Sequence, residues 1–280
     1  MSPVLREVVD LLQCPVCTAT LAVADGALRC PAGHSFDIAR QGYVSLFAGG
    51  GRTGEADTAA MVEAREAFLG AGHYARLGEA LAVEARAIEA PGAIVDIGAG
   101  TGHQLAHVLD ASPERLGVAL DASTAALRRA ARSHARATAI GADAWRDLPL
   151  RDGVAALILS VFAPRNPAEM ARVLAPDGAL LAVTPTTRHL AELVGALGLL
   201  TVPEDKEERL DAQLTPHLIL AARRRIEYPL FLSRGEASEL VRMGPSAWHV
   251  DERTIEERLA SLPDPLTVTM SVTLSRYVRA

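Results

Sequence analysis

The start of the chain carries a set of side chains that could bind a metal ion. The stretch CPVC is followed by CPAGH, and together they use all three cysteines of the 280-residue sequence. A CxxC turn aims both thiolates at one point, and the segment between the two pairs is predicted to form a hairpin that turns at Asp25-Gly26. Three cysteines do not make a closed set of disulfides, whereas three thiolates and one imidazole complete a tetrahedral zinc site. We therefore predict a structural zinc ion held by Cys14, Cys17, Cys30 and His34.

A second group of side chains surrounds a glycine-rich turn. The stretch VDIGAGTGH, residues 95–103, follows an apolar predicted strand and precedes a predicted helix. Its glycines permit positive φ and a close approach of the backbone to a ligand. An acidic residue lies at the end of each of three successive predicted strands, and the carboxyl ends of parallel strands meet at one edge of a sheet. The sequence therefore predicts a binding site at this edge, which contains Gly98, Gly100, Gly102, Asp96, Asp121 and Asp143.

The spacing of the glycines distinguishes between two kinds of cofactor. A dinucleotide site uses GxGxxG, but His103 stands where the third glycine of that pattern would be, and the chain has GxGxG instead. S-adenosylmethionine has no pyrophosphate, and its sites use such a loop after an acidic residue. We predict that Asp96 orients the amino group of its methionine moiety, Asp121 accepts from the ribose hydroxyls and Asp143 accepts from the adenine amino group. Taken singly, each aspartate fits an ordinary turn at a strand end equally well.

Alternating strands and helices position these residues. From residue 93 to residue 185, short apolar segments alternate with helical ones, which predicts right-handed crossovers and an α/β fold with a doubly wound, mostly parallel sheet. The segments RIEYPLFLS and LTVTMSVTLSRYV are predicted to add an antiparallel C-terminal pair. Two helices interrupted at 70–72 are predicted before the first strand. The strands are expected at 93–100, 115–121, 138–143, 154–162, 178–185, 225–233 and 266–278, and the helices between them at 102–109, 123–135 and 167–174.

The length and composition fit one main domain with a small appendage. A chain of 280 residues that is 49% hydrophobic and 22% charged has an ordinary globular composition and can bury a full core. The glycine-rich stretch AGGGRTGEAD at 48–57 is predicted to be a flexible connection. We therefore expect a zinc-binding ribbon domain at 1–48, a linker and helix at 49–72 and a methyltransferase domain at 73–280.

The distribution of charge bears on location and partners. No apolar run reaches the roughly 18 residues of a membrane span, and Glu7 and Asp10 interrupt the first apolar stretch, so we expect a cytoplasmic protein without a membrane partner. The net charge of −6 argues against a protein that holds nucleic acid by its overall charge, and no DNA partner is expected. Local groups could still contact RNA. In the ribbon, Arg40, Tyr43 and Phe47 are candidates for such contacts, or for the closing of the ribbon core.

A series of motifs spread over the chain resembles the pattern of a known family. The ribbon motif continues into HSFDIARQGYVSL and is followed by EADTAAMVEAREAFLGAGHY, VDIGAGTG, VFAP, VTPTTRHLAEL and MGPSAW. In this combination the chain resembles the 23S rRNA (guanine-N1)-methyltransferase family, RlmA, over nearly its whole length. Within that family it is most similar to the actinobacterial branch that protects against tylosin-type macrolides, the TlrB type. The resemblance implies an N-terminal zinc ribbon on a class I methyltransferase that is a homodimer and holds RNA in a cleft between its subunits.

The resemblance also implies roles for single residues. Tyr74 in AGHY and His189 in TTRHL fall on family positions that contact the cofactor. There they join Gly102 and His103 of the glycine loop as cofactor-binding residues. Without the resemblance, Tyr74 and His189 would be assigned to ordinary packing.

The segment after the fourth predicted strand bears on the target atom. Methyltransferases that modify exocyclic amines carry Asn/Asp-Pro-Pro-aromatic here, whereas this chain has VFAP at 161–164. Guanine N1 belongs to a lactam and must lose its proton before it can attack a methyl group, so a proton acceptor would help. Asp143, His189 and a bound water are candidates for that acceptor. Phe162 could stack on an extruded guanine or pack in the core.

Three functions are compatible with these features. The first, which we favour, is methylation of N1 of a guanine in the 23S rRNA hairpin that lines the peptide exit tunnel, with macrolide tolerance as its result. The second is methylation of a small molecule or natural product, which the net acidity favours and the zinc ribbon disfavours. The third is RNA binding without catalysis by a protein with a vestigial cofactor pocket, against which the intact glycine loop and its aspartates speak.

Overall fold

The centre of the molecule is an eight-stranded sheet. The computed structural model describes residues 3–47, 56–244 and 252–279. In spatial order the strands are β10 (Leu218–Leu232), β11 (Leu266–Arg279), β9 (Leu174–Pro185), β8 (Ala155–Val161), β5 (Ala93–Ile97), β6 (Gly117–Asp121), β7 (Ala137–Gly141) and β4 (Val44–Ser45). The strands from β4 to β9 pair in parallel, whereas β11 pairs antiparallel with both β9 and β10. The predicted doubly wound, mostly parallel sheet with an antiparallel C-terminal pair is confirmed.

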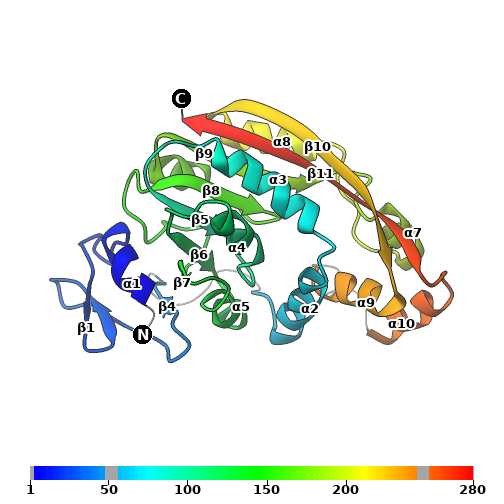
Figure 1. Cartoon of the computed structure of the whole chain (residues 1–280), viewed down its shortest axis with the longest axis horizontal. Coiled ribbons are helices and arrows are strands. Elements are labelled where there is room, and N and C mark those ends of the chain that lie inside the picture. The colour runs from blue at the N-terminus through cyan, green and yellow to red at the C-terminus, as the bar shows by residue number, and fades with distance from the viewer. Residues whose placement is uncertain (1–2, 48–55, 245–251, 280) are drawn as a thin grey trace.

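Helices cover both faces of this sheet (Figure 1). Those that follow the ribbon are α2 (Ala59–Gly70), α3 (Ala75–Arg86), α4 (His103–Asp110), α5 (Thr124–Ala130), α6 (Pro167–Val173), α7 (Ala191–Leu197), α8 (Lys206–Leu214), α9 (Arg234–Arg242) and α10 (Glu252–Ala260). Leu77 of α3, Leu105 of α4 and Leu127 of α5 are buried in the core on one face. Met170 of α6 and Leu214 of α8 are buried on the other. Within the described part of the chain, no helix combines the length and the apolar character that crossing a bilayer requires.

The N-terminal segment packs directly on the main sheet. It contains α1 (Pro3–Val8), the short 3-10 helix η1 (Val9–Leu11), β1 (Ala22–Ala24), β2 (Ala27–Arg29) and β3 (Ser35–Asp37). β1 and β2 form the predicted hairpin, whose two turn residues both have positive φ. Leu5 of α1 shares a buried cluster with Val95 of β5, and β4 extends the main sheet at β7. The division of the chain at residue 48 stays a prediction, and most of the predicted connection at 48–57 lies outside the described residues.

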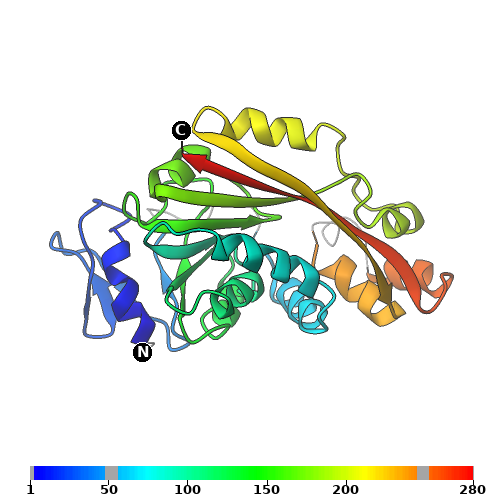
Figure 2. The ribbon, with the colours of Figure 1, turned by 45° about the horizontal axis from the view of Figure 1, so that its top comes forward.

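The strands β10 and β11 form a long antiparallel pair that extends beyond the rest of the sheet (Figure 2). β11 pairs with β9 only over Val272–Val278, whereas its pairing with β10 continues back to Leu266. The extended part packs against α7 and α9, and α10 packs against both of these helices. Ser233 caps α9 through reciprocal hydrogen bonds with Glu236, which fixes where this helix begins. This pair of strands thus carries a layer of helices to one side of the carboxyl edge of the sheet.

Most predicted elements are confirmed to within a few residues. The helix expected at 123–135 is shorter, because the Ser133 hydroxyl donates to the carbonyl of Ala130, where α5 ends and the chain turns. The strands expected at 178–185 and 225–233 are longer, since β9 begins at Leu174 and β10 begins at Leu218. The helices α7 to α10 and the pairing of β4 with β7 lie outside the predictions. Of the motif MGPSAW, the last four residues lie outside the described part of the chain.

Candidate functional site

The four predicted zinc ligands converge at one point of the ribbon. Their ligating atoms all lie within 4.8 Å of one another. Cys17 Sγ is 3.7 Å from Cys30 Sγ, and His34 Nδ1 is 3.6 Å from Cys14 Sγ and 3.3 Å from Cys30 Sγ. A tetrahedral zinc with bonds of roughly 2.3 Å to sulfur and 2.0 Å to nitrogen needs distances of about 3.5 to 3.8 Å between its ligands. The donor set and its spacing therefore fit a closed zinc site with Nδ1 as the histidine ligand.

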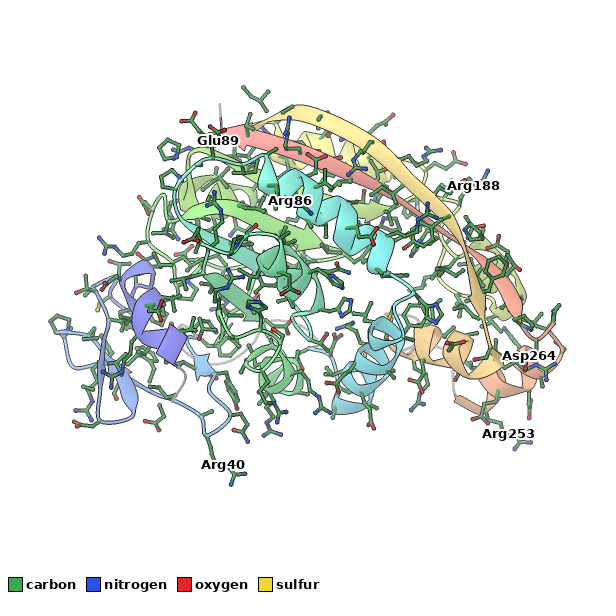
Figure 3. The ribbon with its side chains drawn as sticks, viewed as in Figure 1. Arg40, Arg86, Glu89, Arg188, Arg253 and Asp264 are labelled. Atoms are coloured by element: carbon green, nitrogen blue, oxygen red, sulfur yellow. The ribbon has the colours of Figure 1, made fainter. Side chains whose placement is uncertain are left out.

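The three ribbon residues considered for RNA contacts have different surroundings. Tyr43 packs against the core on the α3 face of the sheet. Phe47 lies against β7, where a Cβ added to Gly141 would come within 3.0 Å of its ring. Arg40 is exposed and projects from the ribbon (Figure 3). Tyr43 and Phe47 therefore help to hold the ribbon on the sheet, and Arg40 stays a candidate for contact with RNA.

A cavity of about 660 Å³ opens at the carboxyl ends of the central parallel strands. The winding of the sheet reverses at β5, between β6 and β8, which is where doubly wound sheets bind their ligands. Gly102 is not among the lining residues. The predicted site residues that do line the cavity are Tyr74, Asp96, Gly98, Gly100, His103, Asp121, Asp143, Phe162 and His189.

The glycine loop is packed too closely for side chains. Gly98 has φ of +70°, and a Cβ at this position would lie 2.7 Å from the Cβ of Ala163. The backbone N–H of Gly100 donates to the Asp121 carboxylate at 2.8 Å, which ties the loop to the end of β6. Gly102 has φ of +78° and faces Ser133 instead of the cavity. Its role is to form the turn into α4, whereas Gly98 and Gly100 shape the cavity wall.

Three carboxyl groups face the cavity, and they differ in their surroundings and hydrogen bonds. Asp96 is only 2% exposed, and its burial, together with the nearby charge of Asp121, raises its pKa to about 8. Burial also raises the pKa of Asp121, although two backbone N–H groups donate to its oxygens at 2.7 and 2.8 Å. Asp143 is buried and accepts a hydrogen bond from the backbone N–H of Trp145 at 3.0 Å. This end of the cavity therefore suits a ligand with a cationic group and several hydrogen-bond donors.

Aromatic rings form a second wall of the cavity. The rings of Phe162 and His189 stack with their centroids 5.6 Å apart and their planes at 28°. The Tyr74 ring lies 6.4 Å from Phe162 and 6.5 Å from His189. Phe162 has φ of 55°, in the left-handed region, and is 43% exposed, so it is not a core residue. A planar ligand could stack on this wall.

The hydrogen bonding of His189 fixes which ring nitrogen carries the proton. The backbone N–H of Ser271 donates to His189 Nδ1 at 3.2 Å. Burial lowers the pKa of His189 to about 4, so the ring is neutral near pH 7. A neutral ring that accepts at Nδ1 carries its hydrogen on Nε2, which can then only donate. This arrangement disfavours His189 as a proton acceptor and leaves Asp143 and water from the predicted set.

Several cavity-lining residues were not predicted from the sequence. Arg65 of α2 forms an ion pair with Asp57 and donates to the carbonyl of Met243 at 2.8 Å, next to the glycine loop. Trp145 is 63% exposed beside the cavity, and its only sequence signal is its place two residues after a predicted site aspartate. Arg165 lines the cavity after the VFAP segment. Neither arginine has a sequence signal of its own, because its neighbours across the cavity come from distant parts of the chain.

Comparison with known proteins gives matches to two parts of the chain and to its whole length. Residues 12–48 match the N-terminal zinc ribbon of RlmA, and residues 94–178 match a methyltransferase domain. A 23S rRNA (guanine(748)-N(1))-methyltransferase of Streptomyces fradiae is 50% identical, over 96% of this chain and 97% of that protein. A protein of Micromonospora griseorubida that is provisionally named a 23S rRNA (guanine-N(1)-)-methyltransferase is 51% identical, over 95% of this chain and 96% of that protein.

A solved structure of another protein has a similar fold. The YcgJ protein from Bacillus subtilis superimposes with a TM-score of 0.51 at 19% identity, over 72% of this chain and 99% of that one. At this identity the likeness concerns the fold alone. The fold, the Cys3His cluster and the full-length relatives agree with one another. The chain belongs to the RlmA family of 23S rRNA (guanine-N1)-methyltransferases.

Proposed function

We propose that this chain methylates N1 of a guanine in 23S rRNA, with S-adenosylmethionine as the methyl donor. The observation that carries the proposal is that buried acidic strand ends and the aromatic wall of Phe162 and His189 line the same cavity. Such a cavity suits a cofactor and a planar acceptor side by side. The family membership and the names of the two full-length relatives support the choice of target.

The donor and acceptor groups of the cavity fit S-adenosylmethionine. The buried carboxyl of Asp96 suits the amino group of the methionine moiety, because a cation beside it would offset the cost of its ionisation. Each oxygen of Asp121 accepts one backbone N–H and keeps a lone pair for a ribose hydroxyl. Asp143 suits the adenine amino group. When bound, S-adenosylmethionine supplies an electrophilic methyl group on a positively charged sulfur.

The protein's part in the proposed reaction is to bring the guanine to that methyl group. Because Asp143 is assigned to the adenine amino group, water would take the proton of guanine N1. N1 would then bond to the methyl carbon, and the electron pair of the broken carbon–sulfur bond would stay on sulfur. Phe162 and His189 hold the base plane by stacking, and the Nε2–H of His189 can donate to an acceptor on the cofactor or the base. Orientation of this kind accounts for much of the rate of an in-line displacement.

Two further groups of expectations belong to the same proposal, one about drug resistance and one about location and assembly. The modified guanine would protect the ribosome against tylosin-type macrolides, as the family resemblance implies. The chain would act as a cytoplasmic homodimer that holds the RNA hairpin between its subunits. Drug sensitivity of a host that carries the gene, and sedimentation of the purified protein, test the first and the second of these expectations separately.

Primer extension on 23S rRNA tests the proposed activity. Methylated N1 cannot pair, so reverse transcriptase should stop at one guanine of the exit-tunnel hairpin after treatment with the protein and S-adenosylmethionine. The Asp96→Ala variant and a reaction without cofactor serve as controls and should give no stop. Full extension after wild-type treatment would contradict the proposal and favour methylation of a small molecule. Absence of cofactor binding in calorimetry would favour RNA binding without catalysis.

A further inference from the structure

The cavity is lined by several residues that the cofactor assignment does not use. Among them are Pro164 and Arg165 in the segment after β8, Thr184 of β9 and Lys206 of α8. Two of these, Arg165 and Lys206, are cations, in contrast to the acidic ends of the central strands. The lining therefore combines groups that suit a cationic ligand with groups that suit hydrogen-bond acceptors.

Arg165 is a largely covered cation of the cavity lining with few hydrogen-bond partners. Among the residues that the structure describes, the one acceptor for its Nη2 is the carbonyl of Val183, at 3.4 Å. Its Nε is buried and has no hydrogen-bond partner in the same part of the chain. Within residues 3–47, 56–244 and 252–279, no carboxylate lies within ion-pair distance of Arg165. By contrast, Arg65 and Arg172, which are also largely covered, each have at least one carboxylate partner.

A covered guanidinium with so few hydrogen-bond acceptors requires an acceptor from outside the chain. Burial lowers the pKa of Arg165, because the guanidinium has lost water without gaining a counter-charge. A guanidinium stays protonated in proteins and can only donate. Covering it with one carbonyl acceptor is unfavourable unless a ligand completes its hydrogen bonds. The ligand must therefore present acceptor atoms, and two neighbouring ones suit the fork of the side chain.

We propose that Arg165 binds O6 and N7 of the target guanine and so selects guanine over adenine. This inference rests on the proposed function. O6 and N7 are neighbouring acceptors to which arginine donates two bonds, whereas adenine presents an amino donor in place of O6. Loss of the N1 proton spreads negative charge onto O6, and a fixed cation there stabilises the state that attacks the methyl group. Arg165 thus links recognition of the base to its activation.

The test combines a changed residue with a changed base. The RNA hairpin is prepared with guanine or 7-deazaguanine at the target position, which removes N7 and leaves N1 and O6. Wild type, Arg165→Met, Arg165→Lys and the control Arg86→Met are compared in single-turnover methylation at saturating cofactor. Arg86 is exposed on α3 and does not line the cavity (Figure 3).

The inference predicts coupling between the two changes. Wild type and Arg86→Met should lose about fivefold to tenfold in rate on 7-deazaguanine, whereas Arg165→Met should lose at least about tenfold on guanine and little more on 7-deazaguanine. The pH–rate profile of Arg165→Met should move to higher pH, because O6 is no longer stabilised. Arg165→Lys keeps the positive charge but not the two parallel N–H donors of the guanidinium. It should therefore keep the wild-type pH–rate profile, and its rate should no longer depend on N7.

Three results would overturn the inference. If the loss in rate caused by Arg165→Met and the loss caused by 7-deazaguanine simply multiply, Arg165 does not contact N7. A loss of cofactor affinity in calorimetry, for Arg165→Met alone, would assign the arginine to the cofactor carboxylate. Weaker RNA binding by the same factor for both bases would assign it to a backbone phosphate. If wild type fails to methylate even the unmodified hairpin, the proposed function fails and not this inference alone.

Discussion

Asp96 shows how one residue links burial to ligand choice. Its carboxyl group is almost fully buried beside a glycine loop, and its pKa is raised to about 8, from 3.8 for the free side chain. Between these two pH values the unfolded chain binds fewer protons at this group than the folded one, so Asp96 makes the free protein less stable as the pH rises. A cationic ligand beside Asp96 stabilises the ionised carboxylate. Asp96 therefore favours the protein with a bound amino group over the protein with an empty site.

The affinity for S-adenosylmethionine should depend on pH through Asp96. Between about pH 5.5 and 7 the ionised carboxylate binds the amino group and the protonated one does not, so affinity should rise with pH in this window. His103 and His189, with pKa values lowered to about 4, do not titrate there. Isothermal titration at several pH values measures the slope. The Asp96→Asn variant should bind more weakly and show no slope, and a slope equal to that of wild type would contradict the role of Asp96.

The glycine loop gives a second prediction at the residue scale. Gly98→Ala adds a Cβ that would lie 2.7 Å from Ala163, whereas Gly153 has a similar φ of +65° with nothing within 4 Å of the added atom. Gly153→Ala should cost about 1 kcal/mol of unfolding free energy from backbone strain alone, and Gly98→Ala about 2 to 4 kcal/mol because the loop must also move. Gly98→Ala should in addition weaken cofactor binding. Equal effects of the two substitutions in denaturant titration and calorimetry would contradict the packing argument.

Sequence reasoning found the residues whose position follows from local pattern. The zinc ligands follow from their spacing, and Asp96, Asp121 and Asp143 follow from strand ends. Arg65 and Arg165 could not be found in this way, because their place at the cavity depends on how α2 and the segment after β8 pack against distant elements. The proton position on His189 depends on a backbone N–H donor 82 residues away.

At the scale of elements, the zinc ribbon and the main sheet form one packing unit. α1 and the ribbon contribute to the same buried cluster as β5, β6 and β7, and β4 adds a strand to the sheet edge. A small metal-bound segment takes much of its folding free energy from the metal. Because its apolar residues also cover the sheet, loss of the metal should affect the whole protein.

Removal of a zinc ligand should therefore destabilise the protein in a single transition. Cys17→Ser should abolish zinc binding and lower the Tm of the one calorimetric transition by roughly 10 °C. The matched control is Val16→Ser, in the same CPVC turn, where the side chain is 55% exposed and offers no ligand to the cluster. It should keep one zinc per chain by elemental analysis and an unchanged Tm. Two separate transitions, with the upper one unaffected in Cys17→Ser, would show that the ribbon and the sheet unfold independently.

The elements also show where sequence patterns become too weak. The central strands are short, apolar and buried at nearly every position, which made their number and their positions along the chain predictable. α8 has only two buried residues in nine, Leu210 and Leu214, so its apolar pattern is slight. The two-residue strand β4 is too short for any pattern. Such elements are positioned by tertiary contacts and not by local preference.

At the scale of the whole molecule, the site is assembled from segments that lie far apart in the sequence. The lining of the cavity runs from residue 56 to residue 244. The long antiparallel pair of β10 and β11 brings α9 beside α2, which carries Arg65 to the glycine loop (Figure 1). The acidic strand ends, the aromatic wall and Arg165 thus line one cavity. This shared cavity is the physical basis for transfer of a group between two ligands.

Transfer of a labelled methyl group tests this account most directly. The purified protein is incubated with 23S rRNA and S-adenosylmethionine carrying a 13C-labelled methyl group, and the RNA is digested to nucleosides for mass spectrometry. The account predicts one labelled N1-methylguanosine per rRNA molecule and none with the Asp96→Ala variant. Label in another nucleoside, or unlabelled rRNA under conditions in which calorimetry shows the cofactor to be bound, would contradict it.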